Sequence, residues 1–273
     1  MLKSVGLFFY FSKFMNRIRL VFKFVIHFLT AKNSYGFGVH SPFIFHFTKF
    51  VIYDKSSYYI FLSIEKIRST LIKDKKVINF VDFGTGKNRS KSINEIASRS
   101  LKSAKYGQFL YRVSDFCKAR NILELGTSFG LTTSYLASSL STSKIVSLEG
   151  SQQIANIAIE NFKLLNIKNI KIVVGDINQT LTKVLNEFDQ LDLIFIDANH
   201  TSEATLSYFE QILKKIHPDS CIVIDDIHWS KDMEKAWKEI KNHNKVTTSI
   251  DLFQVGIVFF NSDLNRKHYK MRF

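Results

Sequence analysis

The feature that most limits the fold begins at Asn121, where short apolar runs rich in β-branched residues alternate with longer amphipathic stretches. Each run is apolar throughout, as expected of strands buried on both faces of a sheet. This order predicts successive βαβ units and a parallel sheet. We expect strands at 121–125, 144–148, 171–174, 191–196 and 221–224, and helices at 132–140, 152–165, 179–188, 202–216 and 231–241.

Two further extended runs, 246–252 and 255–260, close the pattern. Too few residues separate them for a crossover helix, so they are predicted to pair antiparallel. The fold class is therefore α/β, with a mostly parallel sheet and an antiparallel C-terminal hairpin.

Residues 1–104 show no such alternation. They are aromatic and basic, with YGFGVHSPFIF at 35–45 and a run rich in Ser, Lys and Arg at 87–105. We expect a helical N-terminal cap over 1–104, packed on a main domain over 105–273. A length of 273 residues fits one sizeable α/β domain with such an appendage.

Composition places the chain among soluble globular proteins, with 45% hydrophobic and 23% charged residues. The net charge of +14 fits nucleic acid, an anionic membrane surface or an acidic substrate, and it does not choose among them. Cys117 and Cys221 lack the spacing of a zinc site or a disulfide framework. We therefore expect a cytoplasmic protein.

No stretch reaches the roughly 18 uninterrupted apolar residues of a membrane span. The nearest, 20–29, is broken by Lys23 and His27. Two interpretations stay open for it. A helix here could pack its aromatic stripe on the main domain, or residues 1–30 could lie peripherally at the inner membrane surface as an amphipathic helix. The second would use the positive charges of Lys3, Lys13, Arg17, Arg19 and Lys23.

Two glycine turns look alike, VDFGTG at 81–86 and LELGTSFG at 123–130. A nucleoside site needs a strand, a glycine turn, a helix, and an acid at the end of the next strand. Only 123–130 meets this pattern, because the next predicted strand ends at Glu149, whose carboxylate could accept both ribose hydroxyls. After Gly86 comes a polar run, so 81–86 is interpreted as a turn or lid near the site.

Three acids directly follow strand ends, namely Asp197, Asp225 and Asp226. The carboxyl ends of parallel strands share one edge, so these side chains should converge. Converging carboxylates repel unless something positive lies among them, and Mg²⁺ or Mn²⁺ suits such hard oxygen ligands. The alternative is that Asp225 or Asp226 caps the helix beginning near Ser230.

The residues ILELGTSFGLTTSYLA, SLEGS, VVGD and FIDANH resemble the successive motifs of class I S-adenosylmethionine-dependent methyltransferases, over most of 105–262. The resemblance implies a Rossmann-like, seven-stranded sheet with its last strand inserted antiparallel. It also implies S-adenosylmethionine as cofactor. Around its methionine portion the resemblance places Glu124, Gly126, Ser128, Gly130 and Thr132, and it also makes Asp197 a cofactor-binding residue. It places Glu149 at the ribose, and Gly175, Asp176 and Ile177 at the adenine. In the alternative interpretation Asp176 is only a turn residue at the end of a strand.

Within that superfamily the acids look like those of catechol and magnesium-dependent sugar O-methyltransferases, which implies Asp197, Asp225 and Asp226 as metal ligands. Lys105-Tyr106-Gly107-Gln108 also resembles a segment of the catechol enzyme. The catechol family has a basic lysine three residues after the first metal Asp, where this chain has His200. An imidazole is a sensible base near neutral pH, although the change puts a catechol substrate in doubt. His200 could instead stack near the adenine or cap the next helix, and His228 is a weaker candidate.

We therefore expect a methyltransferase that acts on a hydroxyl of a small molecule or sugar with metal assistance, with Asp197 and His200 as catalytic residues. One alternative is a non-catalytic cofactor-binding protein that engages membranes or RNA. Another is a nucleic-acid methyltransferase, which the charge favours but for which the N/D-P-P-Y/F motif is lacking. The sequence indicates neither the acceptor nor the oligomeric state.

Overall fold

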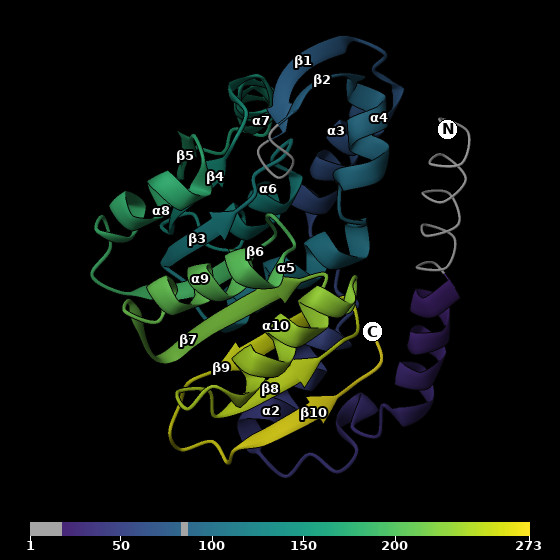
Figure 1. The fold of residues 1–273 in the computed structure, drawn as a ribbon, viewed down its shortest axis with the longest axis vertical. Coiled ribbons are helices and arrows are strands. Elements are labelled where there is room, and N and C mark those ends of the chain that lie inside the picture. The colour runs from purple at the N-terminus through teal and green to yellow at the C-terminus, as the bar shows by residue number, and fades with distance from the viewer. Residues whose placement is uncertain (1–17, 83–86) are drawn as a thin grey trace, which may run out of the picture.

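The computed structural model describes residues 18–82 and 87–273. Its centre is an eight-stranded sheet in the order β10-β8-β9-β7-β6-β3-β4-β5 (Figure 1). The strands are β3 (Asn121–Leu125), β4 (Lys144–Glu149), β5 (Ile170–Val174), β6 (Leu191–Ile196), β7 (Ile216–Asp225), β8 (Thr248–Asp251), β9 (Val255–Phe259) and β10 (Lys267–Lys270). Strands β3 to β7 are parallel, and β9 runs antiparallel between β7 and β8.

The predicted parallel sheet and C-terminal hairpin are thus confirmed, with one addition. Strand β10 pairs in parallel with β8 and makes the sheet eight-stranded instead of seven-stranded. Strand β7 also begins earlier than expected, at Ile216, where a helix was predicted to end. Pro218 lies two residues further on and cannot donate to a helix, which explains why the chain becomes extended here.

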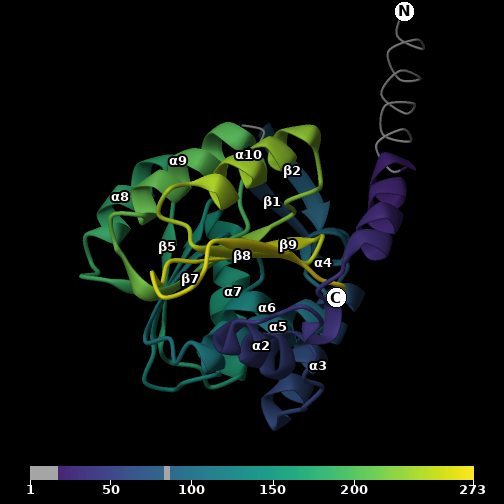
Figure 2. The same ribbon diagram turned by 90° about the horizontal axis from the view of Figure 1, so that it is seen from below.

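Helices cover both faces of the sheet (Figure 2). They are α5 (Ala104–Phe116), α6 (Leu131–Ala137), α7 (Gln152–Leu164), α8 (Ile177–Leu185), α9 (Ser202–Ile212) and α10 (Lys231–Asn242). Alternate strand residues point to opposite faces. Leu123 and Leu125 therefore pack against α8, α9 and α10, whereas Ile122 packs against α5 and α6.

Side-chain caps fix where the helices begin after the sheet's carboxyl edge. The hydroxyls of Ser151, Thr201 and Ser230 accept main-chain N–H groups at the starts of α7, α9 and α10. Each cap satisfies a donor that the first helical turn leaves free. Because Ser230 caps α10, Asp225 and Asp226 are not its caps and are available for other contacts.

The N-terminal region is mostly helical but contains a hairpin that was not predicted. Its elements are a helix over 18–30, η1 (Ser34–Gly36), α2 (Pro42–Phe47), η2 (Thr48–Ile52), α3 (Tyr59–Lys73), β1 (Val77–Asp82), β2 (Lys87–Ser92) and α4 (Ile93–Ser100). Ile44, Phe47 and Val51 join the core around α5. The domain boundary at 104/105 stays a prediction.

Some predicted features fall outside the described residues, namely Lys3, Lys13, Arg17 and the glycines at 84 and 86. Residues 81 and 82 end strand β1, which pairs with β2 and not with the central sheet. Among the described residues, no helix is long and apolar enough to cross a bilayer.

Replacing Ser230 by alanine removes the hydroxyl that accepts the Met233 N–H at the start of α10. We expect the free energy of unfolding to fall by about 1 kcal/mol, measured by urea denaturation followed by circular dichroism. Ser141→Ala, at an exposed turn position, is the control and should leave stability nearly unchanged. An equal loss in both variants would contradict the capping role.

Candidate active site

A cleft opens at the carboxyl edge of the sheet, where the loops after β3, β4 and β5 meet. It is lined by five residues that were predicted to bind the cofactor: Gly126, Glu149, Gly175, Asp176 and Ile177. Phe80 and Val81 of the β1–β2 hairpin line the same cleft, which agrees with a lid or turn near the site. The glycine turn and the acid at 149 therefore face one crevice.

Two main-chain amides hold the Glu149 carboxylate in the cleft wall. One oxygen accepts from Ser128 N at 2.9 Å and the other from Ser151 N at 3.0 Å. Burial raises the pKa of Glu149, and these two hydrogen bonds oppose the rise. Each oxygen of the Glu149 carboxylate has a second lone pair. The group can therefore still accept hydrogen bonds from the two hydroxyls of a ribose.

The two glycines of the turn are required by packing. Gly126 has φ +101°, and a Cβ there would collide with the Asp197 carbonyl. Gly130 has φ +78°, and a Cβ would lie 2.5 Å from the Phe162 ring. The turn is thereby pressed against β6 and α7, which fixes the cleft wall.

Glu124 and Thr132, predicted near the methionine portion, are placed behind this wall. Glu124 is fully buried and accepts hydrogen bonds from the hydroxyls of Thr132, Thr133 and Ser147. Burial raises the pKa of Glu124 to about 7. Glu124 and Thr132 are not among the residues that line the cleft, and their hydrogen bond joins β3 to the start of α6 on either side of the glycine turn.

Asp176 has a structural role as well as a place in the cleft. One carboxylate oxygen accepts from Asn178 N at 2.9 Å and caps α8. Asp176 is therefore a turn residue at the end of a strand, as the alternative interpretation of this position expected. The other oxygen has no protein hydrogen bond among the described residues and lies at the end where an adenine amino group was expected.

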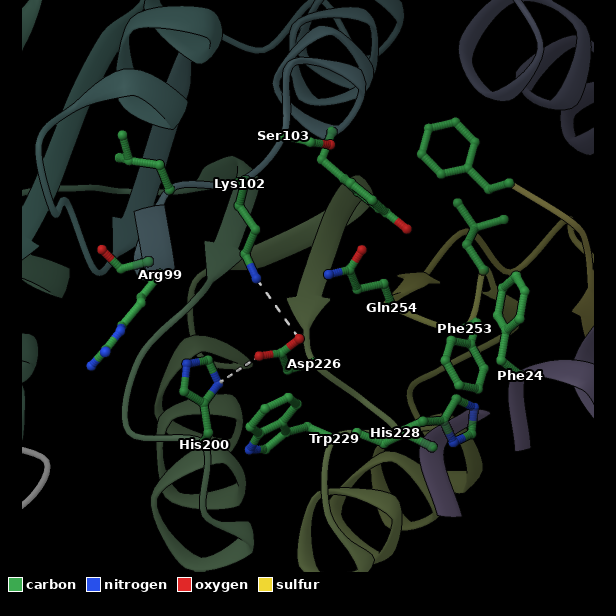
Figure 3. Close-up of a pocket in the computed structure, with 16 residues that line it drawn as sticks. Phe24, Arg99, Lys102, Ser103, His200, Asp226, His228, Trp229, Phe253 and Gln254 are labelled. Atoms are coloured by element: carbon green, nitrogen blue, oxygen red, sulfur yellow. Dashed lines mark ion pairs between the residues drawn. The ribbon is translucent and has the colours of Figure 1, made fainter. Parts of the chain in front are cut away.

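A second cavity of about 620 Å³ lies beside the cleft (Figure 3). The linker before α5, the loop after β6, the loop after β7, the β8–β9 turn and the helix over 18–30 all contribute to it. Aromatic side chains form much of its wall: Phe24, Tyr106, Trp229, Phe253 and Phe273. Its polar end carries His200, Asp226 and Lys102.

Lys102 lies among the three converging carboxylates. Its Nζ donates to Asp225 and is 3.9 Å from an Asp197 oxygen and 3.8 Å from an Asp226 oxygen. The predicted convergence of the acids is therefore seen, together with an ammonium group that the sequence reasoning missed. The only local signal was the basic run at 87–105, which did not distinguish this lysine from its neighbours.

Charge and burial act against each other in this cluster. Burial alone would lower the pKa of Lys102, but the carboxylates of Asp197, Asp225 and Asp226 outweigh it and raise the pKa, so the lysine stays charged. Burial and the charge of Asp197 raise the pKa of Asp225 to about 8. The Lys102 ammonium thus lies close to the partly exposed carboxylates of Asp197 and Asp226 and donates to the buried Asp225.

His200 also faces this cluster. Its Nε2 is 3.6 Å from Asp197 Oδ1, and its Nδ1 is 4.0 Å from Asp226 Oδ2. It lines the second cavity, not the adenine end of the cleft, and Thr201 caps α9 in its place. Asn199 and His200 both have positive φ, of 62° and 45°, a conformation that is uncommon for non-glycine residues, although Asn and His adopt it more often than most.

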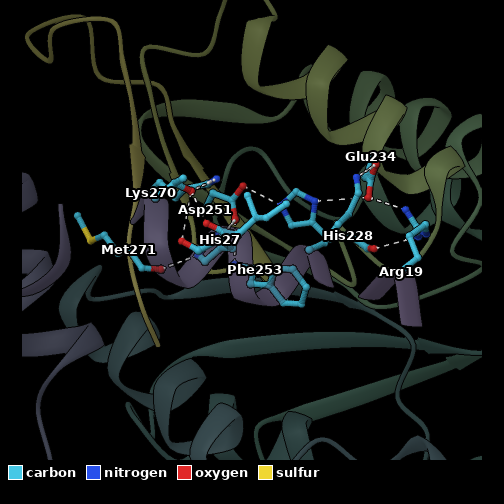
Figure 4. Close-up of polar contacts among 11 residues, drawn as sticks. Arg19, His27, His228, Glu234, Asp251, Phe253, Lys270 and Met271 are labelled. Carbon is cyan, nitrogen blue, oxygen red and sulfur yellow. Dashed lines mark hydrogen bonds and ion pairs between the residues drawn. The ribbon is translucent and has the colours of Figure 1, made fainter. Parts of the chain in front are cut away.

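The weaker candidate, His228, is engaged elsewhere (Figure 4). Its Nε2 is 2.9 Å from Asp251 Oδ2, and its ring stacks on Phe253. His27, from the helix over 18–30, lies on the other side of Asp251 at 3.5 Å. These contacts tie the N-terminal helix to the loop after β7, so His228 is interpreted as structural.

Comparison with known proteins agrees with this geometry. Residues 123–227 match a family model described as a methyltransferase domain. That span covers β3 to β7 and includes Gly126, Glu149, Asp197 and Asp225. These residues are thus similar to a methyltransferase domain, in agreement with the motifs seen in the sequence.

Two relatives are named catechol O-methyltransferase. The protein from Niastella koreensis is 30% identical over 46% of this chain and 57% of its own, and that from Mycobacterium tuberculosis is 29% identical over 47% and 58%. The chain therefore spans less than two thirds of these relatives. An O-methyltransferase from Bacillus cereus, solved in complex with SAH, shares the fold with a TM-score of 0.55 at 22% identity, over 77% of this chain and 95% of its own.

The Glu149→Gln variant tests the cleft. In this variant an amide nitrogen would face the N–H of Ser128 or Ser151, so two donors would meet and one acceptor would be lost. We expect the affinity for S-adenosylhomocysteine, measured by calorimetry, to fall at least tenfold, which corresponds to about 1.4 kcal/mol. Asp192→Asn is a matched control, because Asp192 also accepts two main-chain N–H groups, at the opposite edge of the sheet. Unchanged affinity in Glu149→Gln would refute the assignment.

Proposed function

We propose that this methyltransferase domain transfers the methyl group of S-adenosylmethionine to a hydroxyl oxygen of a small molecule in the second cavity. One observation carries the proposal. Asn199 lines the cleft and the next residue, His200, lines the second cavity, so the two spaces meet at a single loop. Methyl transfer from a sulfonium chiefly requires that donor and acceptor be held close and in line.

The second cavity suits a small acceptor. Its volume is within the range of pockets that hold small molecules. Its aromatic wall favours a ring or another flat apolar group, and its polar end would receive a hydroxyl. The names of the two catechol O-methyltransferase relatives support oxygen as the accepting atom.

His200 is the proposed base. A neutral imidazole would take the proton of the acceptor hydroxyl as the oxygen attacks the methyl carbon and the bond from that carbon to sulfur breaks. The products are the methyl ether and S-adenosylhomocysteine. Asp197 and Asp226 lie within 4.0 Å of the ring and would stabilise the imidazolium that forms.

The predicted Mg²⁺ or Mn²⁺ has to be weighed against Lys102. The oxygen donors of Asp197, Asp225 and Asp226 suit a hard divalent ion in type. The position among them is taken by the Lys102 ammonium, which a metal would have to displace from its hydrogen bond to Asp225. Ligand atoms of Asp197, His200 and Asp225 lie within 4.8 Å of one another, so a divalent ion and the Lys102 ammonium compete for the same place.

We accordingly propose that Lys102 supplies the positive charge at this end of the cavity. An ammonium beside the acceptor oxygen would favour its deprotonated form, as positive groups at developing anions do in other enzymes. Metal assistance is the competing hypothesis, and the two differ in their response to a chelator.

Methyl transfer can be followed from labelled S-adenosylmethionine to phenols, catechols and sugars. We expect His200→Gln to lower turnover about 100-fold or more, with affinity for S-adenosylhomocysteine unchanged. His46→Gln, at an exposed position of α2, is the control. Tight cofactor binding without methylation of any hydroxyl compound would favour a non-catalytic protein, and methylated RNA would favour the nucleic-acid alternative.

Chelation separates the two sources of positive charge. We expect turnover to survive EDTA and calorimetry to detect no Mg²⁺ binding to the native chain. Lys102→Met should lower turnover about 100-fold and, by freeing the carboxylates, allow Mg²⁺ to bind. If EDTA abolished activity and Mg²⁺ restored it, the role proposed for Lys102 would be wrong.

A further inference from the structure

The helix over 18–30 presents its apolar side outward. Val21 and Phe22 are each 65% exposed and Leu29 is 71% exposed. Ile18 and Val25 are also exposed, at 48% and 47%. These five positions fall on one stripe of a helix, at spacings of three, four and seven residues. Figure 2 shows the helix at the margin of the molecule, away from the sheet.

The opposite side of the same helix is polar and faces the protein (Figure 4). Arg19 and Lys23 both contact Glu234 of α10, at 2.9 Å and 2.5 Å. His27 is only 4% exposed, and its Nε2 donates to the Met271 carbonyl at 2.9 Å. Ion pairs and a buried hydrogen bond therefore fix the rotation of the helix about its axis.

This orientation is the reverse of an ordinary surface helix, which buries its apolar stripe and exposes its charges. The interpretation in which the aromatic residues pack on the main domain holds for Phe24, whose ring lies edge-on to Phe253 at 5.2 Å, whereas Phe22 faces outward. A contiguous apolar stripe in water is unfavourable and marks an interaction surface. Something outside the described residues must cover it.

The positive charge of the N-terminal region indicates what covers the apolar stripe. Residues 1–53 contain seven Lys or Arg residues and no Asp or Glu, which is half of the net charge of +14. Lys32 and Lys49, which follow the helix, are exposed. Two of the seven cations are paired with Glu234 on the protein-facing side of the helix. A symmetric contact between two copies would bring the exposed Lys32 and Lys49 together with no acid of this stretch between them. An anionic lipid surface attracts them and accepts the apolar stripe.

We propose that the helix over 18–30 docks in the plane of an anionic membrane, with its exposed stripe in the interface and its polar side on the protein. This inference does not depend on the proposed methyl transfer. It does place the second cavity next to the lipid, because Leu20 and Phe24 of the same helix line that cavity.

The test is co-sedimentation of the full chain with vesicles, either neutral phosphatidylcholine or the same lipid with phosphatidylglycerol. We expect binding to the anionic vesicles that weakens as salt rises, because salt screens the attraction. The double variant F22S/L29S should reduce partitioning at least tenfold. Leu62→Ser is the matched control, because Leu62 is 72% exposed on α3, outside the stripe.

Three results would overturn the proposal. The native chain could fail to bind anionic vesicles, or Leu62→Ser could lose as much binding as F22S/L29S. The stripe could also prove to be a dimer contact, seen as a concentration-dependent dimer in buffer that F22S/L29S abolishes. Retained affinity for S-adenosylhomocysteine, or an unchanged circular dichroism spectrum, shows that the double variant is folded.

Discussion

Three carboxyl groups, one of them fully buried, meet at one edge of the sheet, and the rest of the site depends on the positive charge that lies among them. Lys102 provides the charge from the linker between α4 and α5. Its contact with Asp225 ties that linker to the end of β7 and so forms the polar end of the second cavity. The loop after β6 carries Asp197 and His200 to the same place, and Asp197 also touches the glycine turn through its carbonyl. The loop after β6 thus links the charged cluster around Lys102 to the wall of the cofactor cleft.

Much of this could be predicted because the signals are local. Apolar runs between amphipathic stretches predicted β3 to β7, and the spacing of Gly126 and Glu149 selected the glycine turn that lines a cleft together with Glu149. The features that were missed lack local signals. Strand β2 reads KNRSKS and strand β10 reads KHYK, so neither carries the apolar pattern of a buried strand. Lys102 is 95 residues from Asp197 and 123 from Asp225, and only the folded chain brings them together.

The N-terminal helix shows a related limit. Periodicity reveals that a helix is amphipathic, but not which side the protein takes. Here Glu234, the Met271 carbonyl and Asp251 attract the polar side, all from the C-terminal part of the chain. The same helix borders the cavity proposed for the acceptor, so membrane docking and methyl transfer share one wall. The two proposals remain separable, since one concerns the outer stripe and the other the loop at 197–200.

The most direct measurement is a crystal structure of the chain with S-adenosylhomocysteine, grown with magnesium present. The account predicts the nucleoside between Gly126 and Glu149, the sulfur directed toward His200, and Lys102 still bonded to Asp225 without a metal. A magnesium ion on Asp197, Asp225 and Asp226 with Lys102 turned away would contradict the role given to the lysine. A nucleoside bound anywhere else would contradict the site itself.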